Sequence, residues 1–295
     1  MRFPDGARVV FIGDSLVAAN VALIKIREFY DKNFPNSGIT FYNAGIAGGT
    51  AESAIRYFEK DIMRHKPTHA VLATGVNDSA RWILDEKGRS AERRAEMLRA
   101  YEKYKRNIPA LVDKILDAGI QLTLCTPLPY DEHSDGGPTI KGGFALMLAY
   151  ADFVRGFAKE RGYEILDYHE YFSKLIEEEG TPFSSDRIHP TPEGYLCIAE
   201  AFLRYQGFDD YKAELGTPEY LVEWDECIRR LRTVYGAEYM LVKDLSLDDD
   251  GKLAFVRDGD ARRIWEGTPF NVFAKAYLAD KSSSEALYKR IEELT

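Results

Sequence analysis

Cysteine is scarce in this sequence, and no hydrophobic run is long enough to cross a membrane. The three cysteines among 295 residues, Cys125, Cys197 and Cys227, are too few and too scattered for a disulfide framework or a zinc knuckle. The N-terminal residues pass directly into a strand-like segment, so no signal peptide is expected. No apolar stretch approaches the roughly 20 residues that a membrane helix needs. These absences predict a cytoplasmic protein without a membrane partner.

Positive charge is also in short supply. Lysine and arginine number 39 against 48 aspartates and glutamates, which leaves a net charge of −9, and the basic residues form no stripe along the sequence. An acidic protein repels the phosphate backbone, so nucleic acid is not an expected partner. The rest of the composition, with 45% hydrophobic and 29% charged residues, is typical of a folded protein long enough to bury a core.

Short apolar segments rich in β-branched residues alternate with longer segments of helical periodicity. Because parallel strands are joined by crossover helices, this alternation predicts an α/β fold whose parallel sheet is covered by helices on both faces. Five strands of this kind suit the doubly wound, flavodoxin-like order 2-1-3-4-5, which is taken from fold-level precedent. The expected strands are residues 8–12, 39–42, 69–74, 121–126 and 163–166.

The helix with the clearest start signal follows His189. Thr191 can cap this helix and Pro192 suits its first position, which places His189 just ahead of a helix N-terminus. Within the earlier helices, Pro109 should bend or split the third, because proline removes a backbone donor from the helix interior. These earlier helices are expected at residues 17–31, 51–65, 91–118 and 144–161.

The alternation changes after about residue 207. We therefore divide the chain into a main domain of residues 1–206 and a small α+β extension of residues 207–295, with a helix at 220–235 and a hairpin of strands 240–242 and 253–256. The extension is acidic, with 19 acidic and 13 basic side chains. We expect it to form a subunit interface, which would make the protein a homo-oligomer, or a wall of the substrate pocket.

Three short motifs each follow one of the first three strands. Gly-Asp-Ser-Leu at residues 13–16 opens the first helix, which would place Ser15 at the carboxyl edge of the sheet. A glycine-rich turn at residues 43–50 can point backbone N–H groups into the same crevice. Gly-Val-Asn-Asp at residues 75–78 offers the Asn77 carboxamide as a donor. Taken alone, a serine at such a turn is more often a helix cap, and Asn-Asp in a loop is usually an Asx turn. The glycine-rich motif is equally compatible with a tight turn and cap.

A fourth motif places Asp186 three residues before His189. This spacing lets the carboxylate accept a hydrogen bond from one ring nitrogen, which fixes the tautomer and leaves the other nitrogen to take a proton from Ser15. An isolated histidine at such a turn is more often structural. The interpretation as a catalytic base therefore depends on the other three motifs.

The four motifs occur in order within residues 8–205, and as a set they closely resemble those of the SGNH hydrolases, the GDSL-type esterases and lipases. The resemblance implies that Ser15 is the nucleophile, His189 its base and Asp186 the third member of a triad. It also implies an oxyanion hole formed by Gly48, Asn77 and the Ser15 backbone N–H. The Gly-Ile-Ala-Gly pattern matches the family at Gly48, although the neighbouring glycines at 45 and 49 are alternatives. The resemblance does not extend to residues 207–295.

A triad of this kind hydrolyses esters through an acyl-enzyme and requires no metal or organic cofactor. The expected partner is a small-molecule ester. Family members with polar loops resemble deacetylases, so an O-acetylated carbohydrate is the first hypothesis for the substrate. A lysophospholipase or thioesterase is the alternative within hydrolases, and it would require a long apolar groove. A catalytically idle interaction module is the alternative of a different class.

Other polar or aromatic clusters are given structural interpretations. The loop at residues 130–137, with His133 and Asp135, matches no standard metal spacing. It is interpreted as a solvated loop, with a substrate-side loop as the alternative. The acidic turn at 248–251 lacks the downstream glutamate of a calcium loop. His65, His69 and His169 are interpreted as structural residues. A second set could form a sugar platform or a subunit contact but is assigned to the core of the extension: Trp224, Trp265, Arg262 and Arg263.

Overall fold

The computed structural model describes residues 3–81, 91–134, 136, 141–179, 183–184, 186–208, 245–247, 253–257 and 260–263. The chain divides into two compact units, Met1–Leu215 and Gly216–Thr295. The first contains a five-stranded parallel sheet with its helices, and the second contains a three-stranded antiparallel sheet. No helix within the described residues is both long enough and apolar enough to span a membrane.

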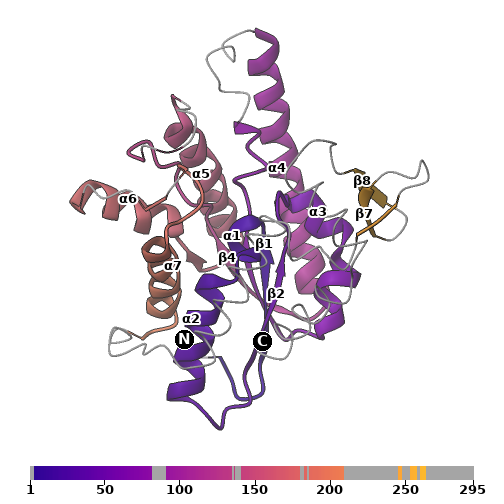
Figure 1. Ribbon diagram of the computed structural model, residues 1–295, viewed down its shortest axis with the longest axis vertical. Coiled ribbons are helices and arrows are strands. Elements are labelled where there is room, and N and C mark those ends of the chain that lie inside the picture. The colour runs from indigo at the N-terminus through magenta and orange to yellow at the C-terminus, as the bar shows by residue number, and fades with distance from the viewer. Residues whose placement is uncertain are drawn as a thin grey trace. The chain divides into compact units, whose positions relative to one another are not determined.

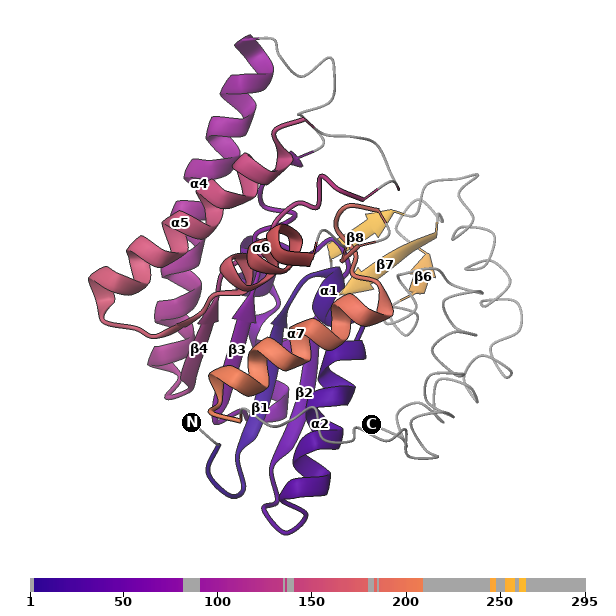
Figure 2. The ribbon, with the colours of Figure 1, turned by 90° about the vertical axis from the view of Figure 1, so that its left-hand side faces the viewer.

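The large sheet has the order β2-β1-β3-β4-β5, and all of its strands are parallel. Figure 1 labels β1, β2 and β4 of this sheet, and Figure 2 shows β2, β1, β3 and β4 side by side in this order. This confirms the predicted doubly wound α/β fold, including the strand order. In register, Gly13 at the end of β1 lies beside Gly45 of β2 and Ala73 of β3, so these three strands end together. The strands are β1 (Arg8–Gly13), β2 (Thr40–Gly45), β3 (His69–Ala73), β4 (Gln121–Cys125) and β5 (Ile165–Leu166).

Helices cover both faces of this sheet. Alternate residues of β1 enter different cores: Val9 and Phe11 pack with α2, α6 and α7, whereas Val10 and Ile12 pack with α3, α4 and α5. Figure 2 shows α6 and α7 in front of the strands. Because both faces are buried, the strand sequences are continuous apolar runs. The helices are α1 (Ser15–Ala18), α2 (Val21–Asn33), α3 (Ala51–Arg56), α4 (Ala91–Asp117), α5 (Gly143–Arg161), α6 (Tyr168–Glu179) and α7 (Pro192–Tyr205).

The first predicted helix is interrupted in the structure. Asn20 adopts a left-handed conformation, with φ of 64°, between α1 and α2. The Asn43 Nδ2 stabilises this break by donating to the Asn20 Oδ1 and to the Val17 carbonyl, both at 2.8 Å. Asparagine tolerates this conformation better than most residues. The prediction of one continuous helix was therefore wrong, because a contact from β2 selects the break.

Two other helical segments also differ from the predictions. The segment predicted as a helix at 51–65 continues beyond α3 as a π-helical turn, η1 (Phe58–Ile62), and a 3₁₀ turn, η2 (Met63–His65). By contrast, α4 runs through Pro109 without being split. The helix that Thr191 was expected to cap is present, since the Thr191 Oγ1 accepts from the Gly194 N–H at 3.1 Å.

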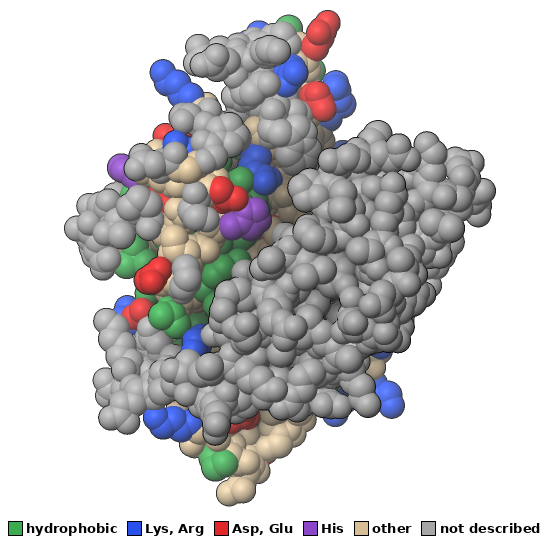
Figure 3. Space-filling view, viewed as in Figure 1, with side chains coloured by type: hydrophobic (Ala, Val, Ile, Leu, Met, Phe, Trp, Pro, Cys, Tyr) green, Lys and Arg blue, Asp and Glu red, His purple; other side chains and the backbone are tan. Residues whose placement is uncertain are grey.

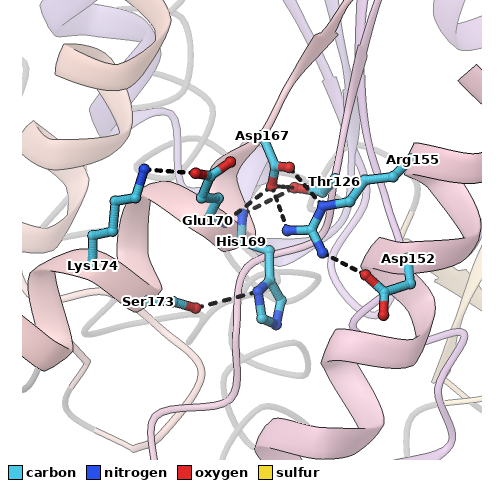
Figure 4. Close-up of polar contacts among 8 residues, drawn as sticks. All are labelled: Thr126, Asp152, Arg155, Asp167, His169, Glu170, Ser173 and Lys174. Atoms are coloured by element: carbon cyan, nitrogen blue, oxygen red, sulfur yellow. Dashed lines mark hydrogen bonds and ion pairs between the residues drawn. The ribbon is translucent and has the colours of Figure 1, made fainter. Parts of the chain in front are cut away.

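No helix was predicted where α6 lies. Asp167 precedes α6 and caps it, because its Oδ1 accepts a hydrogen bond of 2.9 Å from the Glu170 N–H. The same oxygen accepts from the Thr126 hydroxyl at 3.0 Å, and Arg155 forms two further bonds to this carboxylate, at 2.7 and 2.9 Å (Figure 4). The Asp-x-x-Glu spacing is a start signal that the sequence contained.

The second unit contains β6 (Leu245–Leu247), β7 (Leu253–Arg257) and β8 (Asp260–Arg263), in the order β6-β7-β8. β6 and β7 pair antiparallel, as in the predicted hairpin, with β6 at Leu245–Leu247. The first strand predicted at residues 240–242 lies outside the described residues. Arg262 and Arg263 belong to β8. The predicted helix at 220–235, Trp224 and Trp265 lie outside the described residues. The role of residues 207–295 as an interface or a pocket wall stays a prediction.

On the face shown in Figure 3, the described surface carries acidic, basic and histidine side chains among hydrophobic and neutral ones. Basic side chains do not gather into a stripe among the coloured residues of this view. The surface thus has the mixed character that the composition predicts.

His169, on the first turn of α6, is buried in the polar network of Figure 4. Burial and the nearby charge of Arg155 lower the pKa of His169 to about 4. The unfolded chain protonates the same histidine near its ordinary value of about 6.5. Between these values the unfolded state binds more protons, so stability should fall as the pH drops from about 6.5 to about 4, by up to about 3 kcal/mol.

We therefore expect His169→Gln to weaken this acid sensitivity, as measured by urea unfolding at pH 7.5 and pH 4.5. The matched control is His133→Gln, which changes an exposed histidine and should leave the wild-type dependence in place. Equal losses of stability in the wild type and in His169→Gln would contradict this account.

Candidate active site

Ser15 is the first residue of α1, and only Asp14 separates it from the end of β1. Asp14 caps this helix, since its Oδ1 accepts a hydrogen bond of 3.0 Å from the Leu16 N–H. Gly13 allows the sharp turn, because a Cβ there would lie 2.6 Å from the Ala73 carbonyl oxygen. The turn places Ser15 at the carboxyl edge of the sheet, where α/β proteins bind their ligands.

Ser15, His189 and Asp186 form a continuous chain of hydrogen bonds. The Ser15 Oγ lies 2.9 Å from the His189 Nε2, and the His189 Nδ1 lies 2.7 Å from the Asp186 Oδ2. The side chains of His189 and Asp186 are 42% and 45% exposed, so the pair is open to solvent and to a substrate. The fold thus brings together two motifs that are 174 residues apart in the sequence.

Asp186 is held in place by its own loop. Its Oδ1 accepts from the backbone N–H of His189 at 2.7 Å and of Ile188 at 3.1 Å. Burial would raise the pKa of Asp186, but the hydrogen bonds from the His189 ring and backbone outweigh burial and keep that pKa below its usual value. The carboxylate is therefore charged at neutral pH, which suits a partner that stabilises an imidazolium.

A second carboxylate, that of Asp131, anchors the segment that carries this pair. Asp131 is fully buried, and its Oδ2 accepts from the Phe183 N–H at 3.0 Å and from the Ser184 N–H and hydroxyl at 3.2 Å. Its Oδ1 accepts from two N–H groups of its own loop, at 3.0 and 3.2 Å. The Asp131 N–H also donates to the Arg187 carbonyl at 3.0 Å. The loop after β4 is thereby tied to residues 183–190.

In the glycine-rich turn after β2, some backbone N–H groups are already hydrogen-bonded within the fold. The Gly45 N–H donates to the Asn43 Oδ1 at 2.8 Å, and the Gly49 N–H donates to the Ile46 carbonyl at 2.7 Å. Gly48 has a φ of 70°, and within the described residues its N–H has no acceptor. Among the described residues, Gly48 is therefore the glycine of this turn whose N–H is not used within the fold.

Asn77 lies beside the glycine turn. Its Nδ2 donates to the Gly49 carbonyl at 3.1 Å, and its Oδ1 accepts from Arg81 at 3.2 Å. Asp78 links the same two loops, because its carboxylate accepts from the Ala51 N–H at 3.1 and 3.3 Å. The motifs after β2 and β3 are thus adjacent.

Two buried carboxyl groups lie close to these loops. Burial raises the pKa of Asp14 to about 6, against the opposing effects of its helix-cap hydrogen bond and of the charges on His189 and Arg81. Burial also raises the pKa of Asp78 to about 7, against the hydrogen bond from Ala51 and with a further contribution from the charge of Asp14. Both groups therefore change charge near neutral pH, and neither does so independently of the other.

A small cavity of about 50 Å³ lies beneath the Ser15 turn. Two polar atoms that have no hydrogen-bond partner in the described part of the chain, the Asp14 Oδ2 and the Thr74 Oγ1, belong to residues that line it. Most of its other walls are apolar side chains, among them Leu16, Val76 and Leu128. The cavity is much smaller than the roughly 300–1,000 Å³ of typical ligand pockets.

The sequence analysis did not identify Asn43, Arg81 or Asp131 as site residues. Arg81 stands four residues after Asn77 in the sequence, but none of the four motifs includes it. Asp131 has no local signal at all, because the groups that it binds are distant in the sequence. His133, weighed as a metal ligand, is exposed, and no group of three potential ligands occurs among the described residues. Asp135 lies outside them.

A model of the GDSL-like lipase/acylhydrolase family matches residues 11–196. The acetylxylan esterase of Geobacillus stearothermophilus is 26% identical over 225 residues, which are 71% of this chain and 98% of the esterase. The crystal structure of an acetylxylan esterase from the same organism has a TM-score of 0.58 at 22% identity and covers 71% of this chain and 98% of its own.

A gut microbial diltiazem-metabolizing enzyme has a TM-score of 0.61 at 24% identity, over 70% of this chain and 48% of that enzyme. This chain therefore spans about half the length of that enzyme. At these identities the two structures share the fold with this chain.

Gly45 allows β2 and α1 to approach closely, because a Cβ at that position would lie 2.8 Å from the backbone of Ala18. We expect Gly45→Ala to displace α1 and with it Ser15, which would lower ester hydrolysis and destabilise the fold by about 1–3 kcal/mol. Gly156→Ala is the control, since a Cβ there meets no atom within 4 Å and alanine favours the interior of α5. Thermal unfolding and hydrolysis rates test both variants. An unchanged Gly45→Ala protein would refute the close-packing argument.

Proposed function

Because the chain belongs to the GDSL-like lipase/acylhydrolase family, we propose that it removes small acyl groups, acetyl foremost, from esters of a carbohydrate, with Ser15 as nucleophile. Family membership makes the protein a carboxylic ester hydrolase of the SGNH type. Beyond this, we propose which residues carry out the reaction and which substrate they act on. The observation that carries it is the hydrogen-bonded chain from the Ser15 Oγ through His189 to Asp186, at 2.9 and 2.7 Å.

In the proposed reaction, the Ser15 Oγ attacks the ester carbonyl while the His189 Nε2 takes the hydroxyl proton. Asp186 accepts from the His189 Nδ1–H, which holds the tautomer in which Nε2 is the base. The charged carboxylate then stabilises the imidazolium that forms.

Negative charge develops on the carbonyl oxygen during this attack. The proposed donors to it are the N–H groups of Ser15 and Gly48 and the Asn77 Nδ2. Gly48 is supported by its free N–H, since both alternative glycines of the turn use theirs within the fold. Donors fixed in advance stabilise the oxyanion without reorganisation, and removing one typically costs a factor of about 10²–10³ in kcat.

The second half of the reaction repeats the first with water. His189 gives its proton to the departing alcohol, and the Ser15 ester that remains is the acyl-enzyme. Water then attacks this ester, the His189 Nε2 again takes a proton, and the carboxylic acid leaves with the Ser15 hydroxyl restored.

The acetylxylan esterase relative supports the substrate class. Structures of that esterase include catalytic mutants in which a serine, an aspartate or a histidine is replaced by alanine, and its aspartate and histidine are three residues apart. Asp186 and His189 have the same spacing. The open, half-exposed position of this pair also suits a polar alcohol such as a sugar.

The alternative within hydrolases is a lysophospholipase or thioesterase that accepts a long acyl chain. The cavity beneath the Ser15 turn is apolar but measures only about 50 Å³, whereas long-chain acyl groups need pockets several times larger. An acyl group that enters this cavity must therefore be short.

We expect Ser15→Ala to abolish hydrolysis of an aryl acetate and labelling by a fluorophosphonate, because both require the hydroxyl as nucleophile. Ser173→Ala is the matched control: its hydroxyl also lies near a histidine, 3.3 Å from the His169 Nδ1, but Ser173 belongs to none of the four motifs. Full activity of a folded Ser15→Ala protein would eliminate Ser15 as nucleophile.

The substrate class is tested by comparing kcat/KM for acetyl and octanoyl esters of one phenol, together with acetate release from acetylated xylo-oligosaccharides. We expect the acetyl ester to be preferred by about tenfold or more, since a small acyl site excludes extra methylenes. A preference for octanoyl would support the lysophospholipase or thioesterase reading instead.

A further inference from the structure

Arg81 lies directly against the carboxamide that we propose as an oxyanion donor. Its Nη1 donates to the Asn77 Oδ1 at 3.2 Å and to the Val76 carbonyl at 3.0 Å. Arg81 is partly buried, so these bonds are shielded from full solvation. A charged donor makes a stronger hydrogen bond than a neutral one.

A hydrogen-bonded turn between Asn77 and Arg81 brings the guanidinium next to the Asn77 carboxamide. The Ser79 N–H donates to the Gly75 carbonyl at 3.0 Å, and the Ser79 hydroxyl donates to the Val76 carbonyl at 2.7 Å. Ala80 has a left-handed φ of 48°, a conformation that costs an alanine about 1–2 kcal/mol. The chain tolerates this strain just before Arg81.

Within the described residues, the hydrogen bonds of Asn77 use its carbonyl oxygen and one of its two amide hydrogens. Arg81 occupies the Oδ1, and the Gly49 carbonyl accepts one of the two Nδ2 hydrogens at 3.1 Å. The second hydrogen remains for an oxyanion. If the amide were flipped, its NH₂ would face the donors of Arg81 and its oxygen would face the Gly49 carbonyl, and both contacts would be repulsive. Arg81 therefore determines which end of the amide faces the substrate.

The surroundings of Arg81 also link it to the triad. Burial lowers the pKa of Arg81, and the negative charges of Asp14 and Asp186 act against this effect. Arg81 thus lies within the electrostatic field of the carboxylate that orients His189, and it remains a cation at neutral pH.

We propose that Arg81 is a positioning residue that acts through Asn77: it fixes the orientation of the carboxamide and polarises it, so that the free Nδ2 hydrogen is a stronger donor to the oxyanion. This inference rests on the proposed function, in which Asn77 donates to the oxyanion. Hydrogen bonds in series strengthen one another, and preorganised donors contribute mainly in the transition state.

The test is a double-mutant cycle of Arg81→Met and Asn77→Ala, with kcat and KM measured on an aryl acetate. We expect Arg81→Met to lower kcat by about 10- to 100-fold in the wild type, with less than about a threefold change in KM. In the Asn77→Ala background the same substitution should change kcat by less than about twofold, because the group through which Arg81 acts is gone.

Arg81→Lys is the second variant, since an ammonium can still donate to the Asn77 Oδ1, and it should retain more of kcat than Arg81→Met. Arg155→Met is the control, because Arg155 is another partly buried arginine that pairs with carboxylates, Asp152 and Asp167. It should lower the unfolding temperature but reduce kcat little, and by the same factor in both backgrounds.

The same reduction by Arg81→Met in both backgrounds, or no reduction in the wild type, would overturn the proposal. If Arg81→Met fails to fold, the cycle is run with Arg81→Ala, which also removes the donor to Asn77, and equal factors in both backgrounds have the same meaning. Failure of the proposed function is a separate outcome: Asn77→Ala would then leave kcat unchanged, whatever the effect of Arg81.

Discussion

The buried carboxylate of Asp131 is the interaction on which the candidate site depends. Its five hydrogen bonds join the loop after β4 to the segment that begins at Phe183 and carries His189. Leaving a buried carboxylate without its hydrogen-bond partners costs several kcal/mol of folding free energy. Separating the two segments is therefore unfavourable. This tie explains how His189 stays within 2.9 Å of a serine that lies 174 residues earlier in the chain.

Strained backbone surrounds the same site. Asn20, Ala80 and Arg187 have left-handed φ values of 64°, 48° and 75°, and such conformations cost about 1–3 kcal/mol each. Nearby hydrogen bonds offset the strain: Asn20 binds the Asn43 side chain, and Arg187 donates to the Glu132 carbonyl at 3.0 Å. The loops are therefore held in place before any substrate arrives, which is what stabilisation of a developing charge requires.

The sequence predicted the fold well because its strands are buried on both faces. A run such as Val9–Ile12 places alternate side chains in two cores and so contains almost no polar residue. The break at Asn20 was missed because it depends on a side chain from β2 that outweighs local preference. The helix α6 was missed although its local start signal, Asp167 with Glu170, was present in the sequence.

The sequence by itself determined the alternation of strands and helices and the four motifs with Ser15, Asn77 and His189, because periodicity, caps and short spacings are local properties. Only the tertiary structure decided that the Gly48 N–H is free, that Arg81 binds Asn77 and that Asp131 anchors the distant histidine segment. These are contacts between groups that different loops bring together at one edge of the sheet. Which partners meet there depends on strand order and register, and these form only when the whole chain packs.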